Sequence, residues 1–269
     1  MKIVCMGTNA FVVPIFDAAR RAGHEIIAVF TRVPKPAGRK KILTPTPVED
    51  WARANNIPVR YSPRDYDLSP DMVVVASYGV ILRDNVLNSA PCVNIHPSDL
   101  PKYRGASPIR TAIYNGDKTS AVCLMNMVAE CDAGDVLMRV PFDIGDDDTN
   151  DTIEARVSEI GARMLVQYLA TPGDFVATPQ VGTPTFTRKF DGDDEVIDWR
   201  RGPREIHNQV RSLGTGRTKI NGVDVKILKT RIGADGNLEI VTLQPAGKKP
   251  MDWKSFVNGL RGAEIKIGQ

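Results

Sequence analysis

The N-terminal part of the chain alternates short apolar runs with amphipathic stretches, and this alternation limits the folds it can adopt. Four runs have the length and β-branched composition of buried strands: KIVCMG (2–7), EIIAVFT (25–31), DMVVVAS (71–77) and PCVNIH (91–96). Helical spacing recurs between them. Buried strands that alternate with helices predict an α/β fold, a parallel sheet with helices on both faces. Ligands of such sheets bind at the carboxyl ends of the strands, near a switch in strand order.

Composition narrows the class of protein further. The chain has 269 residues, of which 42% are hydrophobic and 25% charged, which excludes a disordered chain and a low-complexity array. No run approaches the roughly 18 consecutive apolar residues of a membrane span, so we expect no membrane partner. The cysteines lie in or beside apolar segments without metal-ligand spacing: Cys5, Cys92, Cys123 and Cys131. We therefore expect free thiols, no bound metal and a cytoplasmic location.

The character of the sequence changes after residue 171, where a Gly-, Pro- and Thr-rich segment begins. Helical spacing with Pro203 in the first turn predicts a helix over 201–213. The Asn221-Gly222 pair between two apolar runs predicts a β-hairpin. We expect a first domain over 1–175, a linker over 176–199 and a small, strand-containing domain over 200–269.

Charge is distributed unevenly along the chain. Residues 200–269 contain 14 Lys and Arg but only 6 Asp and Glu, whereas the whole chain has 35 and 32. The segment RVPKPAGRKKILTPT (32–46) has five basic residues and no acidic ones, and we expect an exposed loop there. Such basic surfaces are typical of proteins with a polyanionic partner, although a solvated face explains the same charge equally well.

Asn94 and His96 stand two residues apart at the end of a predicted strand, so their side chains project from the same face. An amide donor can stabilise a developing oxyanion and an imidazole can move a proton, a combination that suits acyl transfer. Asp132, in the turn DAGD (132–135), could orient the imidazole. His24 and His207 are interpreted as structural. The chain has neither a serine nucleophile elbow nor a metal-ligand set, so we expect direct transfer without a covalent intermediate.

The run NIHPSDLPKYRGASPI (94–109), followed by DAGD (132–135), resembles the 10-formyltetrahydrofolate-dependent formyltransferases. Other segments are similar to the branch of that family that formylates methionyl-tRNA. They are MGTNAFVVPIF (6–16), PAGRKK (36–41), TPTPV (44–48), IDW (197–199), EIH (205–207) and QPAGKKPM (244–251). The resemblance therefore extends over nearly the whole chain.

The resemblance implies a Rossmann-like formyltransferase domain followed by a reduced OB-like, β-rich domain. Asn94 and His96 would polarise the formyl carbonyl and stabilise a tetrahedral oxyanion. Asp132 would pair with His96 and help manage the proton of the attacking amine. The co-substrate 10-formyltetrahydrofolate would lie against two groups of residues: Ser98, Asp99, Leu100 and Pro101, and Tyr78, Val80 and Ile81. The second group lies in YGVIL (78–82), a sequence equally typical of a hydrophobic core.

The implied acceptor is the α-amine of charged methionyl-initiator-tRNA, bound by a monomeric enzyme. Its contacts would come from basic residues in two places: Arg39, Lys40 and Lys41 in the basic loop, and Lys248 and Lys249 near the C-terminus. The chain departs from the family pattern at Asp99, where an apolar residue is usual, and at Arg83, where proline is usual. Its second domain is also short for a five-stranded barrel.

The short second domain motivates an alternative acceptor, a nucleotide-linked amino sugar or another small amine. The basic segments argue against it, because a sugar nucleotide needs no extended cationic surface. A third interpretation, a non-catalytic nucleic-acid binder, would not need the set Asn94, His96 and Asp132. A nicotinamide-dependent dehydrogenase is rejected, because MGTNAF lacks the pattern G-x-G-x-x-G and the second strand ends at Thr31 without an acidic residue.

Overall fold

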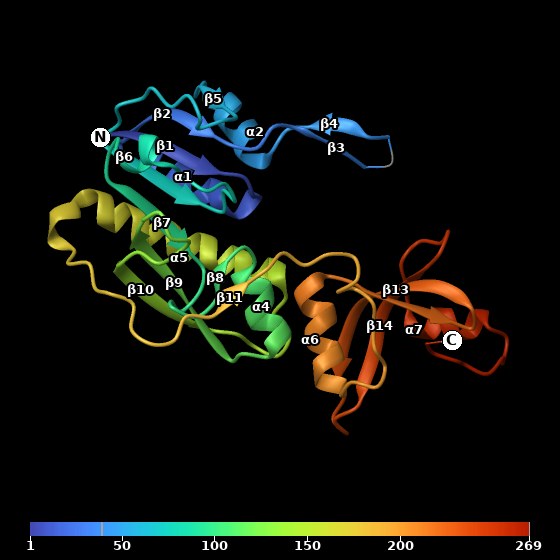
Figure 1. Ribbon diagram of the computed structural model, residues 1–269. Coiled ribbons are helices and arrows are strands. Elements are labelled where there is room, and N and C mark those ends of the chain that lie inside the picture. The colour runs from blue at the N-terminus through green and yellow to red at the C-terminus, as the bar shows by residue number, and fades with distance from the viewer. Residues whose placement is uncertain (39, 269) are drawn as a thin grey trace. The chain divides into compact units, whose positions relative to one another are not determined.

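The chain forms two compact units, each assembled from separate stretches of sequence. The computed structural model describes residues 1–38 and 40–268 (Figure 1). The first unit contains 1–106, 120–142 and 154–187, and the second contains 107–119, 143–153 and 188–269. Among the described residues, no helix combines the length and the apolar character needed to cross a membrane.

The elements of the first unit follow the apolar runs of the sequence. In chain order they are β1 (Lys2–Gly7), α1 (Val13–Arg21), β2 (Glu25–Phe30), β3 (Lys35–Ala37), β4 (Ile42–Thr44), α2 (Pro47–Ala54), β5 (Val59–Arg60), β6 (Met72–Ala76), α3 (Asp84–Leu87), β7 (Cys92–His96), β8 (Arg104–Gly105), β9 (Thr119–Asn126), β10 (Val136–Asp143), α5 (Asn150–Ala170) and β11 (Phe186–Thr187). Within the described residues, seven of these strands form one sheet in the order β10-β9-β7-β6-β1-β2-β5.

The strand order places a switch point between β1 and β6, which are parallel neighbours. From β1 the chain continues to β2 and β5 on one side, and it then returns to β6 and β7 on the other. β1 ends at Gly7. A larger residue does not fit at this position, because a Cβ there would lie 2.7 Å from the carbonyl oxygen of Ala76. Just beyond, Asn9 Nδ2 donates to Ser77 Oγ at 2.8 Å and joins the two loops at the switch point. This carboxyl edge is where such sheets bind their ligands.

Helices cover both faces of this sheet, as the sequence predicts. On one face, Val86 of α3 packs into a buried cluster with side chains such as Val75 of β6. On the other face, Ile15 of α1 and Ile95 of β7 crowd Gly161 of α5, where a Cβ would lie 2.9 Å from the Ile15 side chain. Side chains alternate along a strand, so Cys92 of β7 faces α3, whereas Ile95 of the same strand faces α5.

The sheet departs from the predicted parallel arrangement at one strand. β9 runs antiparallel to β7, with His96 opposite Cys123 and Val93 opposite Asn126. A parallel connection needs a crossover that returns the chain to the starting edge of the strands. The intervening helix, α4 (Pro108–Asn115), instead belongs to the second unit, where it packs on α6 (Pro203–Leu213). β9 therefore begins at the carboxyl edge and runs back beside β7.

The predicted basic loop over 32–46 forms an antiparallel hairpin, β3 and β4, which extends away from the sheet (Figure 1). Ile42 and Leu43 in this hairpin are about two-thirds exposed, at 63% and 67%. The segment ends at Thr46, whose hydroxyl accepts from the backbone N–H of Glu49 and caps α2. The hairpin thus has a fixed base and an exposed tip.

The second unit is rich in β-strands, as predicted. After α4 and α6 it contains β12 (Gly216–Ile220), β13 (Val223–Ile232), β14 (Leu238–Pro245), β15 (Met251–Asp252) and α7 (Trp253–Gly259). Among the described residues, these four strands form one antiparallel sheet in chain order. The predicted turn is present, because Asn221 and Gly222 both have positive φ angles, 49° and 76°. Val210 of α6 packs with Ile227 and Leu243 in the core.

His207 is buried in this unit, and both of its ring nitrogens are paired. Nε2 donates to the carbonyl oxygen of Asp146 at 3.0 Å, and Nδ1 lies 2.9 Å from the hydroxyl of Thr230. Burial lowers the pKa of His207, which favours the neutral ring, and in that form Nδ1 accepts from Thr230. The histidine of the unfolded chain keeps a pKa near ~6.5, so protonation favours unfolding as the pH falls below that value.

We therefore expect the melting temperature of the wild-type protein to fall between about pH 7.5 and about pH 5.5, and to fall less in His207→Gln. The measurement is thermal unfolding of both proteins across that range. Both chains keep His24, whose pKa burial also lowers, so its contribution cancels in the comparison. Identical pH dependence in the two proteins would contradict the assignment.

Candidate active site

Asn94 and His96 lie together at the carboxyl end of β7. Asn94 pairs with Val75 of β6, whose side chain belongs to the cluster that α3 covers. His96 follows two residues later and therefore faces the same side of the sheet. Both residues are almost fully buried, with 7% and 4% of their surface exposed. The strand thus presents the two side chains as the sequence predicts.

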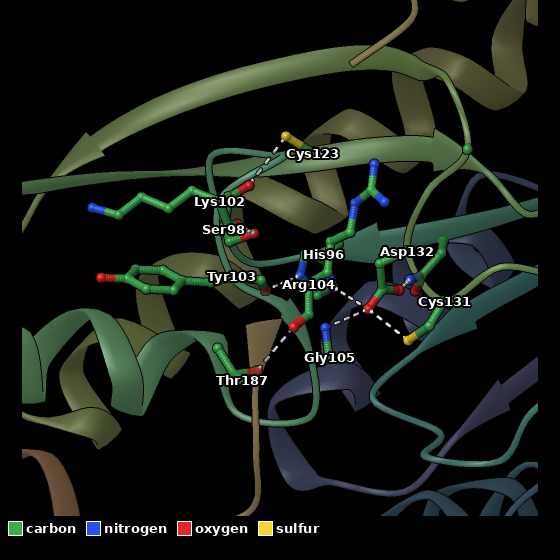
Figure 2. Close-up of polar contacts among 12 residues, drawn as sticks. His96, Ser98, Lys102, Tyr103, Arg104, Gly105, Cys123, Cys131, Asp132 and Thr187 are labelled. Atoms are coloured by element: carbon green, nitrogen blue, oxygen red, sulfur yellow. Dashed lines mark hydrogen bonds and ion pairs between the residues drawn. The ribbon is translucent and has the colours of Figure 1, made fainter. Parts of the chain in front are cut away.

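Asp132 joins them from a turn that is remote in sequence. Its carboxylate accepts hydrogen bonds from Asn94 Nδ2 at 3.2 Å, from the backbone N–H of Gly105 at 2.8 Å and from Cys131 Sγ at 3.4 Å. Asp132 Oδ2 also lies 3.7 Å from His96 Nδ1. Figure 2 shows the carboxylate between His96, Gly105 and Cys131. The three residues proposed from the sequence are therefore one cluster.

The hydrogen bond of His96 defines the orientation of its ring. Nε2 lies 2.9 Å from the backbone carbonyl oxygen of Tyr103. A carbonyl oxygen only accepts, so Nε2 carries the hydrogen of this bond. Nδ1 then faces the Asp132 carboxylate, whose Oδ2 lies 3.7 Å away. The geometry suits a residue that holds or moves a proton beside a polar reaction.

Two residues with left-handed backbone conformation hold the cluster. Asp132 has φ 48° and Tyr103 has φ 61°. Tyr103 supplies the carbonyl oxygen that His96 contacts, and the following residues, Arg104 and Gly105, form strand β8. Non-glycine residues in this conformation are uncommon and cost of order 1–3 kcal/mol where they occur. The surrounding hydrogen bonds therefore stabilise the backbone conformation of both loops.

Of the loop residues predicted to contact folate, two are buried in the protein. Ser98 is fully buried, and its hydroxyl donates to the carbonyl oxygen of Lys102 at 2.6 Å. Leu100 packs in a core cluster. Asp99, Leu100 and Pro101 border a cavity of about 470 Å³, although Leu100 is only 1% exposed. Asp99 and Pro101 are the more exposed of these residues.

The other predicted folate segment is divided in a similar way. Tyr78 is buried, its hydroxyl has no hydrogen-bond partner among the described residues, and burial raises its pKa to about 12. Val80 and Ile81 are exposed, at 42% and 82%. The segment follows β6 directly, beside the switch point of the sheet. Exposed apolar side chains at that edge fit contact with the flat face of a heterocycle.

The predicted tRNA contacts lie on exposed surface where the structure describes them. Lys40 and Lys41 are exposed in the β3–β4 hairpin, and Lys248 and Lys249 are exposed after β14. Arg39 lies outside the described residues. The second unit also contains a basic cleft of about 980 Å³ that the sequence did not reveal, whose lining includes Arg217, Lys219 and Lys226 beside Trp199. Arg217 and Lys219 lie on β12, whereas Lys226 lies on β13 and Trp199 precedes α6, so no single short run of sequence contains them all.

Two further residues of the site were also missed, Arg104 and Gln180. Gln180 donates to the backbone carbonyl oxygens of Asp132 and Gly134, both at 2.8 Å. Arg104 in turn donates to Gln180 Oε1. Arg104 stands inside the motif PKYRGASP, but Gln180 lies in the Gly-, Pro- and Thr-rich segment, which gave no signal of a site. Among the described residues, no group of His, Cys, Asp and Glu is arranged to hold a metal ion.

The chain is similar to known proteins over most of its length. Residues 1–169 match the family model described as formyl transferase. The methionyl-tRNA formyltransferase of Jannaschia sp. is 36% identical, over 97% of this chain and 97% of the relative. That of Halalkalibacterium halodurans is 34% identical, over 100% and 97%.

Solved structures share the fold at lower identity. A methionyl-tRNA formyltransferase from Clostridium thermocellum has a TM-score of 0.64 at 17% identity, and covers 91% of this chain and 98% of its own. An N-formyltransferase from Helicobacter canadensis, in complex with folinic acid and dTDP-3-aminofucose, has a TM-score of 0.67 at 20% identity, over 87% and 88%. The chain therefore belongs to the methionyl-tRNA formyltransferase family and is a formyl transferase.

Proposed function

We propose that the enzyme transfers the formyl group of 10-formyltetrahydrofolate to the α-amine of methionyl-initiator-tRNA. The observation that carries this proposal is the cluster of Asn94, His96 and Asp132 at the carboxyl edge of the sheet, in a chain whose relatives over nearly their full length are methionyl-tRNA formyltransferases. The first unit, which carries these three residues, would perform the chemistry. The β-rich domain over 200–269 would add cationic surface for the acceptor.

The proposed mechanism divides the work among the three side chains. Asn94 Nδ2 and the His96 ring would donate to the formyl oxygen as the amine attacks, and so stabilise the oxyanion. Asp132 would hold His96 through Nδ1 and take up the proton that the attacking amine loses. The tetrahedral intermediate would then collapse as the bond between the formyl carbon and folate N10 breaks, and the proton would pass to N10 so that tetrahydrofolate leaves. Because Asn94 already donates to Asp132, substrate binding must redirect its amide or use the second N–H of that amide. Because His96 Nε2 already donates to the carbonyl oxygen of Tyr103, the imidazole must release that bond to donate to the formyl oxygen.

We propose that the folate lies along the switch-point edge. Val80 and Ile81 offer exposed apolar contact, and Asp99 and Pro101 border the cavity next to the catalytic loop. Ser98 and Leu100 would support this border from within, because one closes the loop by a hydrogen bond and the other packs in the core. Asp99 pairs with Arg139, which also donates to the carbonyl oxygen of Leu100 at 2.7 Å.

We propose that the acceptor tRNA contacts the exposed hairpin and the basic surface of the second unit. Nucleic-acid binding releases counterions, so the logarithm of affinity falls with the logarithm of salt by about 0.9 for each phosphate contact in a duplex. A free amino-sugar nucleotide would give a much flatter response. Salt dependence of the acceptor KM therefore separates the two acceptor classes.

A charge reversal in the hairpin should weaken the tRNA acceptor specifically. In Lys40→Glu we expect the KM for methionyl-tRNA to rise several-fold, the salt slope to decrease by about 1, and the KM for 10-formyltetrahydrofolate to stay within about twofold. Steady-state kinetics at several salt concentrations measure all three. Arg163→Glu, an exposed charge reversal on α5, is the matched control. Equal losses in the two variants would contradict a contact at the hairpin.

The function itself is tested by a formyl-transfer assay with 10-formyltetrahydrofolate. Charged methionyl-initiator-tRNA is compared with a panel of amino-sugar nucleotides at matched concentrations. Formylation of the tRNA that weakens steeply with salt supports the proposal. Turnover confined to a sugar nucleotide would keep the chemistry and overturn the acceptor.

A further inference from the structure

The segment predicted as the start of a linker is built into the catalytic unit. Residues 178–187, here called the strap, belong to the first unit, and Figure 1 shows β11 at their end beside β8. At its beginning, Thr178 exchanges two backbone hydrogen bonds with Val136, at 2.8 and 2.9 Å. At its end, β11 pairs in parallel with β8, with Phe186 opposite Arg104. The strap therefore spans from the turn that carries Asp132 to the loop that follows His96.

The strap also bonds directly to the loop that orients His96. Thr185 accepts from the backbone N–H of Arg104 at 2.8 Å through its carbonyl oxygen, and from the N–H of Tyr103 at 2.9 Å through its hydroxyl. Tyr103 is the residue whose carbonyl oxygen contacts His96. Figure 2 shows this region beside Thr187, which donates to the carbonyl oxygen of Arg104 at 3.3 Å.

One strap side chain contacts the other catalytic loop. Gln180 Nε2 donates to the backbone carbonyl oxygens of Asp132 and Gly134, while its Oε1 accepts from Arg104 Nε at 3.1 Å and Nη2 at 2.9 Å. Arg104 is 7% exposed, and its Nη1 donates to Glu130 at 3.0 Å. The Arg104 guanidinium thus binds the oxygen of the Gln180 amide, and the N–H groups of that amide point to the turn at 132–134.

We propose that Gln180, oriented by Arg104, is a positioning residue that places the Asp132 carboxylate beside His96. Asp132 has a left-handed backbone, a conformation that persists where surrounding contacts hold it, and the bond from Gln180 to the Asp132 carbonyl oxygen is such a contact. The amide is the one chemical group that can accept from Arg104 and donate to two carbonyl oxygens at once. This inference rests on the proposed function only for its kinetic consequence, and the geometry stands without it.

The decisive variant is Gln180→Glu. The carboxylate still accepts from Arg104, but it loses both N–H donors and places a negative charge against two carbonyl oxygens. We expect kcat for formyl transfer to fall about 10- to 100-fold, in the range of a lost positioning contact, while the KM for 10-formyltetrahydrofolate stays within about threefold. Gln167→Glu, the same exchange at an exposed position of α5, is the matched control and should behave as wild type.

Cys131 provides a second readout that needs no activity. It is exposed, whereas Cys5, Cys92 and Cys123 are buried. Partial burial and the neighbouring Asp132 carboxylate raise the pKa of the Cys131 thiol to about 11. If the carboxylate moves away in Gln180→Glu, this pKa falls and alkylation by iodoacetamide at mildly alkaline pH becomes faster. Peptide mapping identifies the labelled residue, and Asp132→Ala sets the upper limit of the rate.

The outcomes separate a positioning role from a structural one. A lower kcat with faster Cys131 alkylation, at an unchanged folate KM, supports the proposal. A lower melting temperature with wild-type kcat and wild-type alkylation overturns it, as does full activity in a stable protein.

If Gln180→Glu does not fold, Gln180→Asn is the second variant. Its shorter amide cannot span both partners, so it should show the same two changes in smaller degree, and their absence overturns the proposal. A wild-type enzyme that formylates no methionyl-tRNA would refute the proposed function, while the alkylation rates would still decide on Gln180.

Discussion

Asp132→Ala and His96→Ala should each lower kcat by roughly 10³-fold, because each removes a group that acts mainly in the transition state. Binding of 10-formyltetrahydrofolate should stay within a few-fold, because neither side chain lies in the apolar segment Val80–Ile81 or lines the cavity at Asp99. Single-turnover kinetics and equilibrium binding of folate measure the two quantities separately. The double variant should lose little more than either single variant, because the two residues act as a unit.

Two matched substitutions make this prediction specific. Asp132→Asn keeps the size of the side chain but removes the charge that faces His96 Nδ1, so kcat should remain strongly reduced. Asp174→Asn, the same exchange at an exposed position of the first unit, should leave kcat unchanged. Activity within a few-fold of wild type in Asp132→Ala or His96→Ala would show that the assigned mechanism is wrong.

Gly134→Ala should have the second large effect, because the Asp132 turn has no room for a methyl group at this position. A Cβ on Gly134 would lie 1.9 Å from the carbonyl oxygen of Asn126, which is backbone and cannot rotate aside. The turn must shift, and both the Asp132 carboxylate and the bond from Gln180 to the Gly134 carbonyl oxygen must move with it. We expect soluble protein with a lowered melting temperature and a kcat reduced at least 10²-fold, since misplacement of about 1 Å already costs that much.

The control for this variant is Gly173→Ala in the same unit. A Cβ on Gly173 would meet no heavy atom of the described residues within 4 Å, and the φ angle of Gly173 is not in the left-handed region. The melting temperature and kcat of Gly173→Ala should therefore match the wild-type values. Equal activity of Gly134→Ala and Gly173→Ala would show that the turn adapts freely and that Asp132 needs no fixed position.

Local patterns were enough to predict the elements that position Asn94 and His96. The apolar runs gave the strands, and the two-residue periodicity placed Asn94 and His96 on one face. The Asn221-Gly222 turn followed from backbone preferences that only a few residues satisfy. These features depend on neighbouring residues, so the sequence contains their cause.

Long-range features could not be predicted in the same way. β9 runs antiparallel to β7, and the helix before it, α4, belongs to the second unit instead of crossing over the sheet. The residues of β9 alone do not indicate this direction. Gln180 lies in a segment rich in Gly, Pro and Thr. Its proposed role arises from contacts with Asp132 and Gly134, which are more than 40 positions away in the sequence (separations of 48 and 46). The burial of Ser98 and Leu100 likewise depends on how their loop folds against the sheet. Composition describes such a segment as a linker, whereas tertiary hydrogen bonds make it part of the site.

The central claim is that this chain formylates methionyl-tRNA, and one competition experiment tests it directly. The enzyme is given 10-formyltetrahydrofolate that carries an isotopic label in the formyl group, together with equal concentrations of methionyl-initiator-tRNA and dTDP-3-aminofucose. Mass spectrometry then follows the label into each acceptor over time. The account predicts that the label appears on the methionyl α-amine and that Asp132→Ala abolishes its appearance. Label found on the sugar nucleotide, with the tRNA unmodified, would contradict it.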